Sequence, residues 1–227
     1  SKRRGNHFKV ALVGYTNAGK STLMKALSGA DVFIEDQLFA TLDTTIRSVE
    51  LDNAHTILLS DTVGFVRKLP HHLVASFRST LKEVIKADLI LLVLDSSSNQ
   101  VTDHHNTIID VLKDLGAERR QMLIVLNKID LKSAEKQISY LRRKFPSGIY
   151  VSALNNLRID KLTQNISEIM DENYQIVNLK FSYQESKELA QAQEGVDVLE
   201  RNYEDDHVQL KIKGSRWRIS QIQSKLK

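Results

Sequence analysis

The chain has 227 residues, of which 41% are hydrophobic and 26% are charged, and it contains no cysteine. This composition is that of an ordinary globular protein with a substantial core, and it excludes disulfides and cysteine-ligated metal centres. The formal net charge of +4 comes from the start of the chain, because residues 1–9 carry four basic side chains and no acidic one. Residues 1–7 are therefore predicted to be a basic tail, either solvated or in contact with RNA phosphates.

No apolar run approaches the roughly 18 residues that a membrane span needs, and the first residues, SKRRG, are too polar for a secretory signal. We therefore expect a soluble protein that does not contact membranes. The lack of cysteine fits a reducing compartment, so the expected location is cytoplasmic and the expected state is a monomer.

The first predicted elements are a strand over residues 8–13 and a helix over residues 20–28, joined by the sequence GYTNAGKST. The spacing GxxxxGKS at a strand-to-helix turn is typical of a phosphate-binding loop, whose glycines let successive N–H groups point at one anion. Lys20 is predicted to reach the β- and γ-phosphates of a nucleotide, and Ser21 to place its hydroxyl on Mg²⁺. The candidate nucleotide contacts of this loop are Gly14, Tyr15, Thr16, Asn17, Ala18, Gly19, Lys20, Ser21 and Thr22.

Residues 30–45 show no clean period and are predicted to form a mobile loop, followed by a hairpin of strands 46–52 and 55–61. In a nucleotide switch such a loop supplies a threonine to Mg²⁺ and the γ-phosphate. Thr45 is the candidate for this role, and Thr44 stays an alternative on spacing alone.

The sequence DTVG at residues 61–64 ends this hairpin. Asp61 is predicted to hold Mg²⁺ through water, and the N–H of Gly64 to meet the γ-phosphate. Phe65 comes next and has no side-chain amide with which to orient an attacking water, so we expect slow intrinsic hydrolysis. The catalytic candidates are thus Lys20, Thr45, Gly64 and Phe65.

Two continuous apolar runs, residues 88–95 and 122–128, are predicted to be strands buried on both faces. The sequence NKID closes the second run. Asp130 can accept hydrogen bonds from guanine N1–H and its exocyclic amine, whereas adenine N1 is itself an acceptor, so the predicted base is guanine. The stem of Lys128 is expected to lie along the base plane. The candidate base contacts are Asn127, Lys128, Asp130, Ser152, Ala153 and Leu154.

Helical stretches separate the strands, including an apolar stripe over residues 73–85 and helices near 133–145 and 156–172. This alternation predicts a doubly wound, mainly parallel α/β sheet over residues 8–173, with ligands at the carboxyl ends of its strands. From residue 174 to 227 the pattern predicts a small α+β domain of β-α-β-β-α order, with Ser215 capping its last helix.

In this order and at this spacing, the segments GYTNAGKSTL, EDQLFATLD, DTVGFVRKLPHHLV and NKIDL closely resemble those of the HflX-type ribosome-associated GTPases. The resemblance covers residues 8–173, and the region after residue 174 fits that family's C-terminal domain. It implies GTP and GDP as ligands, Mg²⁺ as cofactor, and the large ribosomal subunit, both RNA and protein, as partner. The implied role is the splitting or rescue of stalled or idle ribosomes. The alternative is a GTP-gated ribosome- or RNA-binding module in ribosome assembly, whose hydrolysis only ends binding.

The family usually has proline and two threonines where this chain has Thr44-Thr45-Ile46, and alignment places the metal-binding threonine at Thr45. Related GTPases with asparagine at the position of Asn17 often use K⁺ beside the phosphates, so Asn17 is a candidate K⁺ ligand; the alternative is a side chain that only stabilises the loop. Full-length members carry a further N-terminal domain and a helical linker, of which residues 1–7 are expected to be the end.

The remaining conspicuous side chains are given structural roles. His71-His72 is expected to serve a helix start or a contact with RNA or protein, and His104-His105 to be solvated on a surface helix. Trp217 is expected to anchor the last helix to the small sheet.

Overall fold

The computed structural model describes residues 8–29, 45–52, 55–61, 64 and 84–226. Several sequence expectations lie outside these residues, namely those for residues 1–7, Thr44, Phe65, His71-His72 and most of the helix at 73–85; the side chain of Trp217 is likewise not described. Contacts divide the chain within one helix, between Asn165 and Ile166, into two units. The division into domains at residues 7–8 and 173–174 stays a prediction.

The first unit contains a six-stranded sheet in the order β2-β3-β1-β4-β5-β6. All neighbouring strands are parallel except the β2–β3 pair. The strands are β1 (Phe8–Gly14), β2 (Thr45–Glu50), β3 (Thr56–Asp61), β4 (Leu89–Asp95), β5 (Gln121–Asn127) and β6 (Ile149–Tyr150).

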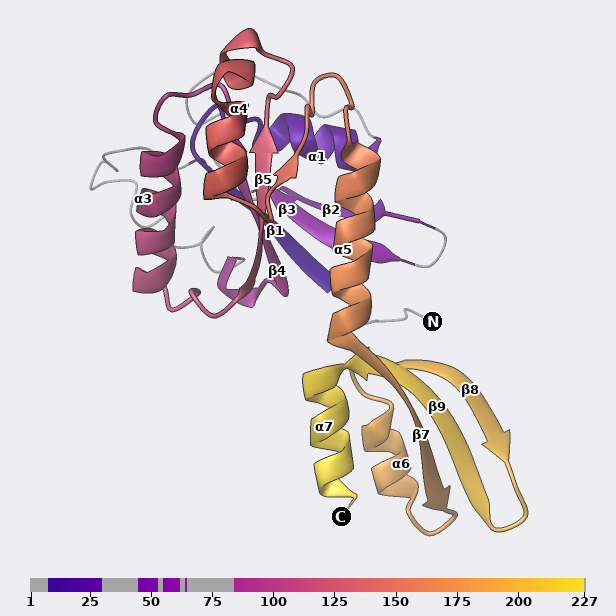
Figure 1. Ribbon diagram of the computed structural model, residues 1–227. Coiled ribbons are helices and arrows are strands. Elements are labelled where there is room, and N and C mark those ends of the chain that lie inside the picture. The colour runs from indigo at the N-terminus through magenta and orange to yellow at the C-terminus, as the bar shows by residue number, and fades with distance from the viewer. Residues whose placement is uncertain (1–7, 30–44, 53–54, 62–63, 65–83, 227) are drawn as a thin grey trace. The chain divides into compact units, whose positions relative to one another are not determined.

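Helices cover both faces of this sheet, with α1 and α5 on one side and α3 and α4 on the other (Figure 1). They are α1 (Lys20–Ser28), α3 (Val101–Asp114), α4 (Lys132–Lys144) and α5 (Ile159–Asn173). The predicted doubly wound, mainly parallel α/β fold is confirmed. The two central strands are buried almost throughout, which explains why their sequences are apolar runs without alternation.

The strand register brings the carboxyl ends of four strands to one edge of the sheet. Leu12 of β1 is paired with Asp61 of β3, and Asp95 of β4 with Asn127 of β5. Because the order of the strands reverses direction at β1, this edge is where a doubly wound fold places its ligand.

The second unit contains an antiparallel sheet of order β7-β9-β8. Its elements, in chain order, are β7 (Tyr174–Ser182), α6 (Ser186–Ala192), β8 (Asp197–Tyr203), β9 (His207–Ser215) and α7 (Arg216–Lys225). The predicted β-α-β-β-α order of a small α+β unit is therefore confirmed. So is the predicted cap, because Ser215 Oγ accepts a hydrogen bond from the N–H of Arg218 at 3.3 Å. Alternate residues of β7 and β9 pack with α7 in a core of Leu179, Phe181, Leu210, Ile212, Ile219 and Ile222.

Within the described part of the chain, none of the helices combines the length and the apolar character that crossing a bilayer requires.

Candidate functional site

The loop between β1 and α1 has the backbone geometry of an anion cradle. Asn17 and Gly19 have positive φ angles of 61° and 91°, so the chain curls tightly before α1 begins at Lys20. A Cβ at Gly19 would lie 2.3 Å from Nδ2 of Asn127, so glycine is required there by space as well as by conformation. The first N–H groups of a helix have no partner within it, so the start of α1, directly after this curl, favours an anion.

Lys20 is buried under this loop, with 7% of its surface exposed. Its Nζ donates hydrogen bonds to the carbonyl oxygens of Gly14 at 3.2 Å and Tyr15 at 3.0 Å. Burial lowers the pKa of the Lys20 ammonium to about 8, and the nearby carboxylate of Asp61 offsets part of this effect. A desolvated cation that is hydrogen-bonded only to neutral carbonyl oxygens is well suited to receive an anion.

Ser21 and Asp61 place two hard oxygen donors next to each other. Ser21 Oγ donates a hydrogen bond of 2.7 Å to Oδ2 of Asp61, which lies at the end of β3 and is 3% exposed. Thr45, at the start of β2, is the register partner of Asp61 and is exposed. The structure thus brings the three predicted Mg²⁺ ligands to one end of the sheet, and hydroxyl and carboxylate oxygens are the donors that Mg²⁺ prefers.

Gly64 approaches the phosphate-binding loop closely. A Cβ at this position would lie 2.8 Å from the Cα of Thr16, which leaves room only for glycine. The backbone of Gly64 therefore borders the phosphate-binding loop, as its predicted contact with the γ-phosphate requires. Phe65, its neighbour and a predicted catalytic residue, lies outside the described residues.

A cavity of about 340 Å³ borders Gly19 of the phosphate-binding loop. Five of the six predicted base contacts line it, namely Asn127, Lys128, Asp130, Ser152 and Leu154, and the rest of the lining is Gly19, Thr22 and Leu131. Leu131 was not among the candidates, although its place directly after the NKID sequence is a signal for it. The lining combines carboxylate, ammonium and hydroxyl groups with aliphatic side chains, a mixture suited to a flat heterocycle with polar edges.

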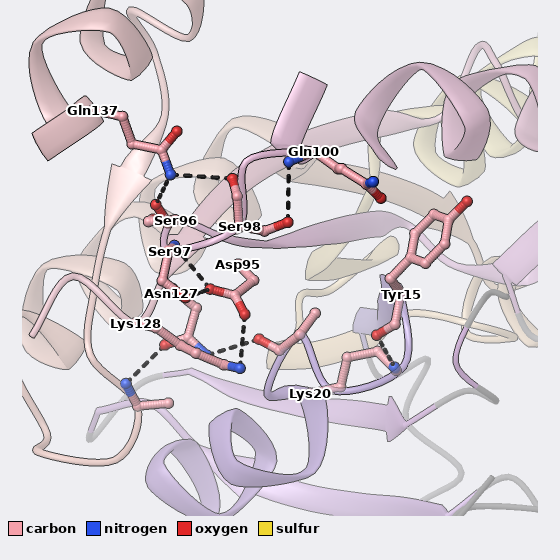
Figure 2. A network of polar contacts seen from close by, with 12 residues as sticks. Tyr15, Lys20, Asp95, Ser96, Ser97, Ser98, Gln100, Asn127, Lys128 and Gln137 are labelled. Atoms are coloured by element: carbon pink, nitrogen blue, oxygen red, sulfur yellow. Dashed lines mark hydrogen bonds and ion pairs between the residues drawn. The ribbon is translucent and has the colours of Figure 1, made fainter. Parts of the chain in front are cut away.

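Asn127, labelled in Figure 2, joins the phosphate-binding loop to Ala153, which lies in the chain between the cavity-lining residues Ser152 and Leu154. Its amide Nδ2 donates to the carbonyl oxygen of Ala18 at 3.0 Å, and its Oδ1 accepts from the N–H of Ala153 at 3.0 Å. The side chain is 2% exposed. Asn127 therefore holds the two halves of the site together, and both predicted contacts Ala18 and Ala153 meet it through their backbone.

The expectation that His104-His105 is solvated on a surface helix needs correction. Both residues are half-buried, since the ring of His104 stacks on Tyr15 with centroids 3.9 Å apart and that of His105 lies 5.1 Å from Phe145. Both histidines lie three or four residues from buried Val101 or Ile108, on the inward face of α3. The ring of Tyr15 therefore packs against α3, while its backbone carbonyl accepts the hydrogen bond from Lys20.

The comparisons agree with this geometry. A family model described as 50S ribosome-binding GTPase matches residues 9–128, which is more than half of the chain. The chain belongs to this family of GTPases. The phosphate-binding loop and the Asn127-Lys128 pair lie within the matched residues.

Curated relatives narrow the assignment to the HflX type. The GTPase HflX of Caldanaerobacter subterraneus subsp. tengcongensis is 41% identical over 215 residues, which are 92% of this chain and 48% of the relative. That of Flavobacterium psychrophilum is 54% identical over 127 residues, 56% of this chain and 30% of the relative. The chain thus spans about half the length, or less, of these curated relatives.

Solved structures support the fold. A GTP-binding protein from the archaeon Sulfolobus solfataricus, determined in complex with GDP, is similar with a TM-score of 0.56 and 27% identity, covering 73% of this chain and 53% of that one.

Proposed function

We propose that this GTPase binds GTP at the edge formed by β1, β3 and β5 and hydrolyses it to GDP and phosphate with Mg²⁺. The observation that carries the proposal is the pair of contacts of Asn127, which lines the same cavity as Asp130 and binds both Ala18 of the cradle and Ala153, the residue between cavity-lining Ser152 and Leu154. Phosphate and base pockets built as one unit are what a nucleoside triphosphate requires.

Guanine is the base that the cavity favours. Asp130 supplies a carboxylate that accepts hydrogen bonds from guanine N1–H and the exocyclic amine, and the aliphatic stem of Lys128 offers a flat surface to the ring. Adenine would place an acceptor against the carboxylate, which leaves both groups unsatisfied. GTP and GDP are thus the proposed ligands.

The residues around the γ-phosphate have distinct tasks. Ser21, Asp61 and Thr45 would hold Mg²⁺, which when bound neutralises charge on the β- and γ-phosphates. Lys20 turns from the carbonyls of Gly14 and Tyr15 toward the phosphates, and the N–H of Gly64 donates to the γ-phosphate. These groups stabilise charge that develops as the terminal phosphate departs.

The position after Gly64 is occupied by Phe65, which cannot orient water through a side-chain amide. We therefore propose a slow intrinsic rate that a partner accelerates. The description of the family as ribosome-binding supports the large ribosomal subunit, its RNA and protein, as that partner, and the splitting or rescue of ribosomes as the biological role. GTP then holds the ribosome-binding state in the cytoplasm, and hydrolysis ends it.

Asn17 is the proposed ligand of a K⁺ ion beside the phosphates. The structure also provides a reason for asparagine that involves no ion, because its φ of 61° is a conformation that asparagine tolerates better than most residues. The two roles are separable, since glycine keeps the backbone conformation and removes the side chain.

Turnover of GTP in Mg²⁺ buffer, measured as phosphate release with K⁺ or Na⁺ as the only monovalent cation, tests both hydrolysis and the ion. We expect K⁺ to raise the rate about tenfold, the effect of about 1.4 kcal/mol of added charge stabilisation. Asn17→Gly should lose the difference between the two cations and keep its GDP affinity. An equal response to K⁺ in Asn17→Gly and in the wild type would contradict the ion role, and absence of phosphate release in either salt would contradict the proposed activity.

A further inference from the structure

The carboxylate of Asp95 lies beside the base pocket without belonging to its lining. Asp95 is the last residue of β4 and the register partner of Asn127 at the end of β5. Its Oδ2 is 2.8 Å from Nζ of Lys128, as Figure 2 shows. The two side chains are only 20% and 31% exposed, so water screens this ion pair less than one on the open surface.

Asp95 is itself held in place. Its Oδ1 accepts hydrogen bonds from the N–H of Ser97 at 2.9 Å and from Ser97 Oγ at 2.5 Å. The following loop is tied to α4 by Gln137, whose Nε2 donates to the carbonyl oxygens of Ser96 and Ser98. The N–H of Ser96 donates to the carbonyl of Asn127 at 2.8 Å. The carboxylate is therefore a fixed point from which one oxygen is directed at Lys128.

The side chain of Lys128 is long and flexible, so an anchor for its Nζ affects how well it is ordered. It has a positive φ of 64°, and its stem runs past the phosphate-binding loop, where its Cε is 3.9 Å from the position of a Cβ on Gly19. A free lysine side chain has many rotamers, and ordering it when ligand binds costs conformational entropy. Anchoring Nζ before the ligand arrives removes much of that cost.

We propose that Asp95 is a positioning residue for the guanine nucleotide: it anchors Nζ of Lys128 so that the lysine stem is preset as one wall of the base pocket. Asp95 acts only through Lys128 and does not touch the nucleotide. This inference rests on the guanine site proposed above, and it adds a residue at the end of a different strand. Its consequence is slow release of GDP.

The test is the dissociation rate of a fluorescent GDP analogue from the full chain. Asp95→Ala should accelerate release about tenfold, which corresponds to loss of one charged hydrogen bond. Asp95→Asn, which keeps an acceptor oxygen but no charge, should give an intermediate rate and serves if the alanine variant fails to fold. Asp110→Ala is the matched control: it makes the same change on the exposed face of α3, where the side chain is 74% exposed, and it should stay within about twofold of the wild type.

A mutant cycle separates positioning from a general structural effect. In a Lys128→Met background, Asp95→Ala should have no further effect on GDP release, because the group it positions is gone. Affinity for inorganic pyrophosphate, which has no base, should be unchanged by Asp95→Ala. Equal acceleration in both backgrounds, an equal loss of pyrophosphate affinity, or no effect at all would overturn the inference. If the wild type shows no preference for GDP over ADP, the guanine site itself fails instead.

Discussion

Asp130→Asn is expected to reverse the base preference of this GTPase from guanine to xanthine. Asp130 lines the cavity, and in the proposed site its carboxylate accepts hydrogen bonds from two donor groups of guanine. An asparagine amide can instead donate to the C2 carbonyl that xanthine carries in place of the amine. A polar mismatch that is enclosed when the base binds discriminates by about 10⁴-fold. We expect the GDP affinity of the variant to fall by about that factor. Its XDP affinity should become higher than its GDP affinity, as measured by equilibrium titration of each nucleotide.

The matched control is Asp110→Asn, which makes the same chemical change on the exposed face of α3, where the Asp110 side chain is 74% exposed. This variant should bind GDP like the wild type. Unchanged GDP affinity in Asp130→Asn would show that the cavity lined by Asp130 is not the base pocket.

Lys20→Met is expected to abolish measurable GTP hydrolysis and to weaken GTP binding at least about 100-fold. The variant keeps the length of the side chain and its packing under the loop, so the loss reports the charge. Lys25→Met, a change of the same type near the end of α1, is the control and should leave turnover unchanged.

The lowered pKa of Lys20 predicts that nucleotide affinity depends on pH. In the free protein the ammonium loses its proton as the pH rises through about 8. Bound phosphates favour the charged form and raise that pKa, so above pH 8 binding must take up a proton. GDP affinity should therefore be level below pH 8 and fall by up to about tenfold per pH unit above it. Lys20→Met should show no such fall, and a level wild-type profile up to pH 9.5 would contradict the buried cation.

The parts of the site that could be predicted are those whose geometry is local in the sequence. The GxxxxGKS spacing predicts its own strand, turn and helix, and α1 begins and ends at the expected residues 20 and 28. The placement of Asp61 and Asp130 followed from the general rule that motifs at the ends of parallel strands meet at one edge. These predictions needed the fold class alone.

What could not be predicted depends on the register of strands that are distant in the chain. The ion pair between Asp95 and Lys128 exists because β4 and β5 pair Asp95 with Asn127; a shift of one residue would remove it. The bond from Asn127 to Ala18 spans 109 residues. The stacking of His104 on Tyr15 depends on which face α3 turns toward the sheet. The pair of histidines in the sequence does not reveal that orientation.

The measurement that tests the central claim most directly is GTP turnover by this chain with and without purified large ribosomal subunits, in Mg²⁺ and K⁺. Phe65 gives the site no side-chain amide for the attacking water, and in the proposed mechanism the partner positions that water. We predict a slow rate alone and a rise of about tenfold or more at saturating subunits, equivalent to at least about 1.4 kcal/mol of barrier lowering. A rate that is the same with and without subunits would contradict the account of a ribosome-activated guanine-nucleotide switch.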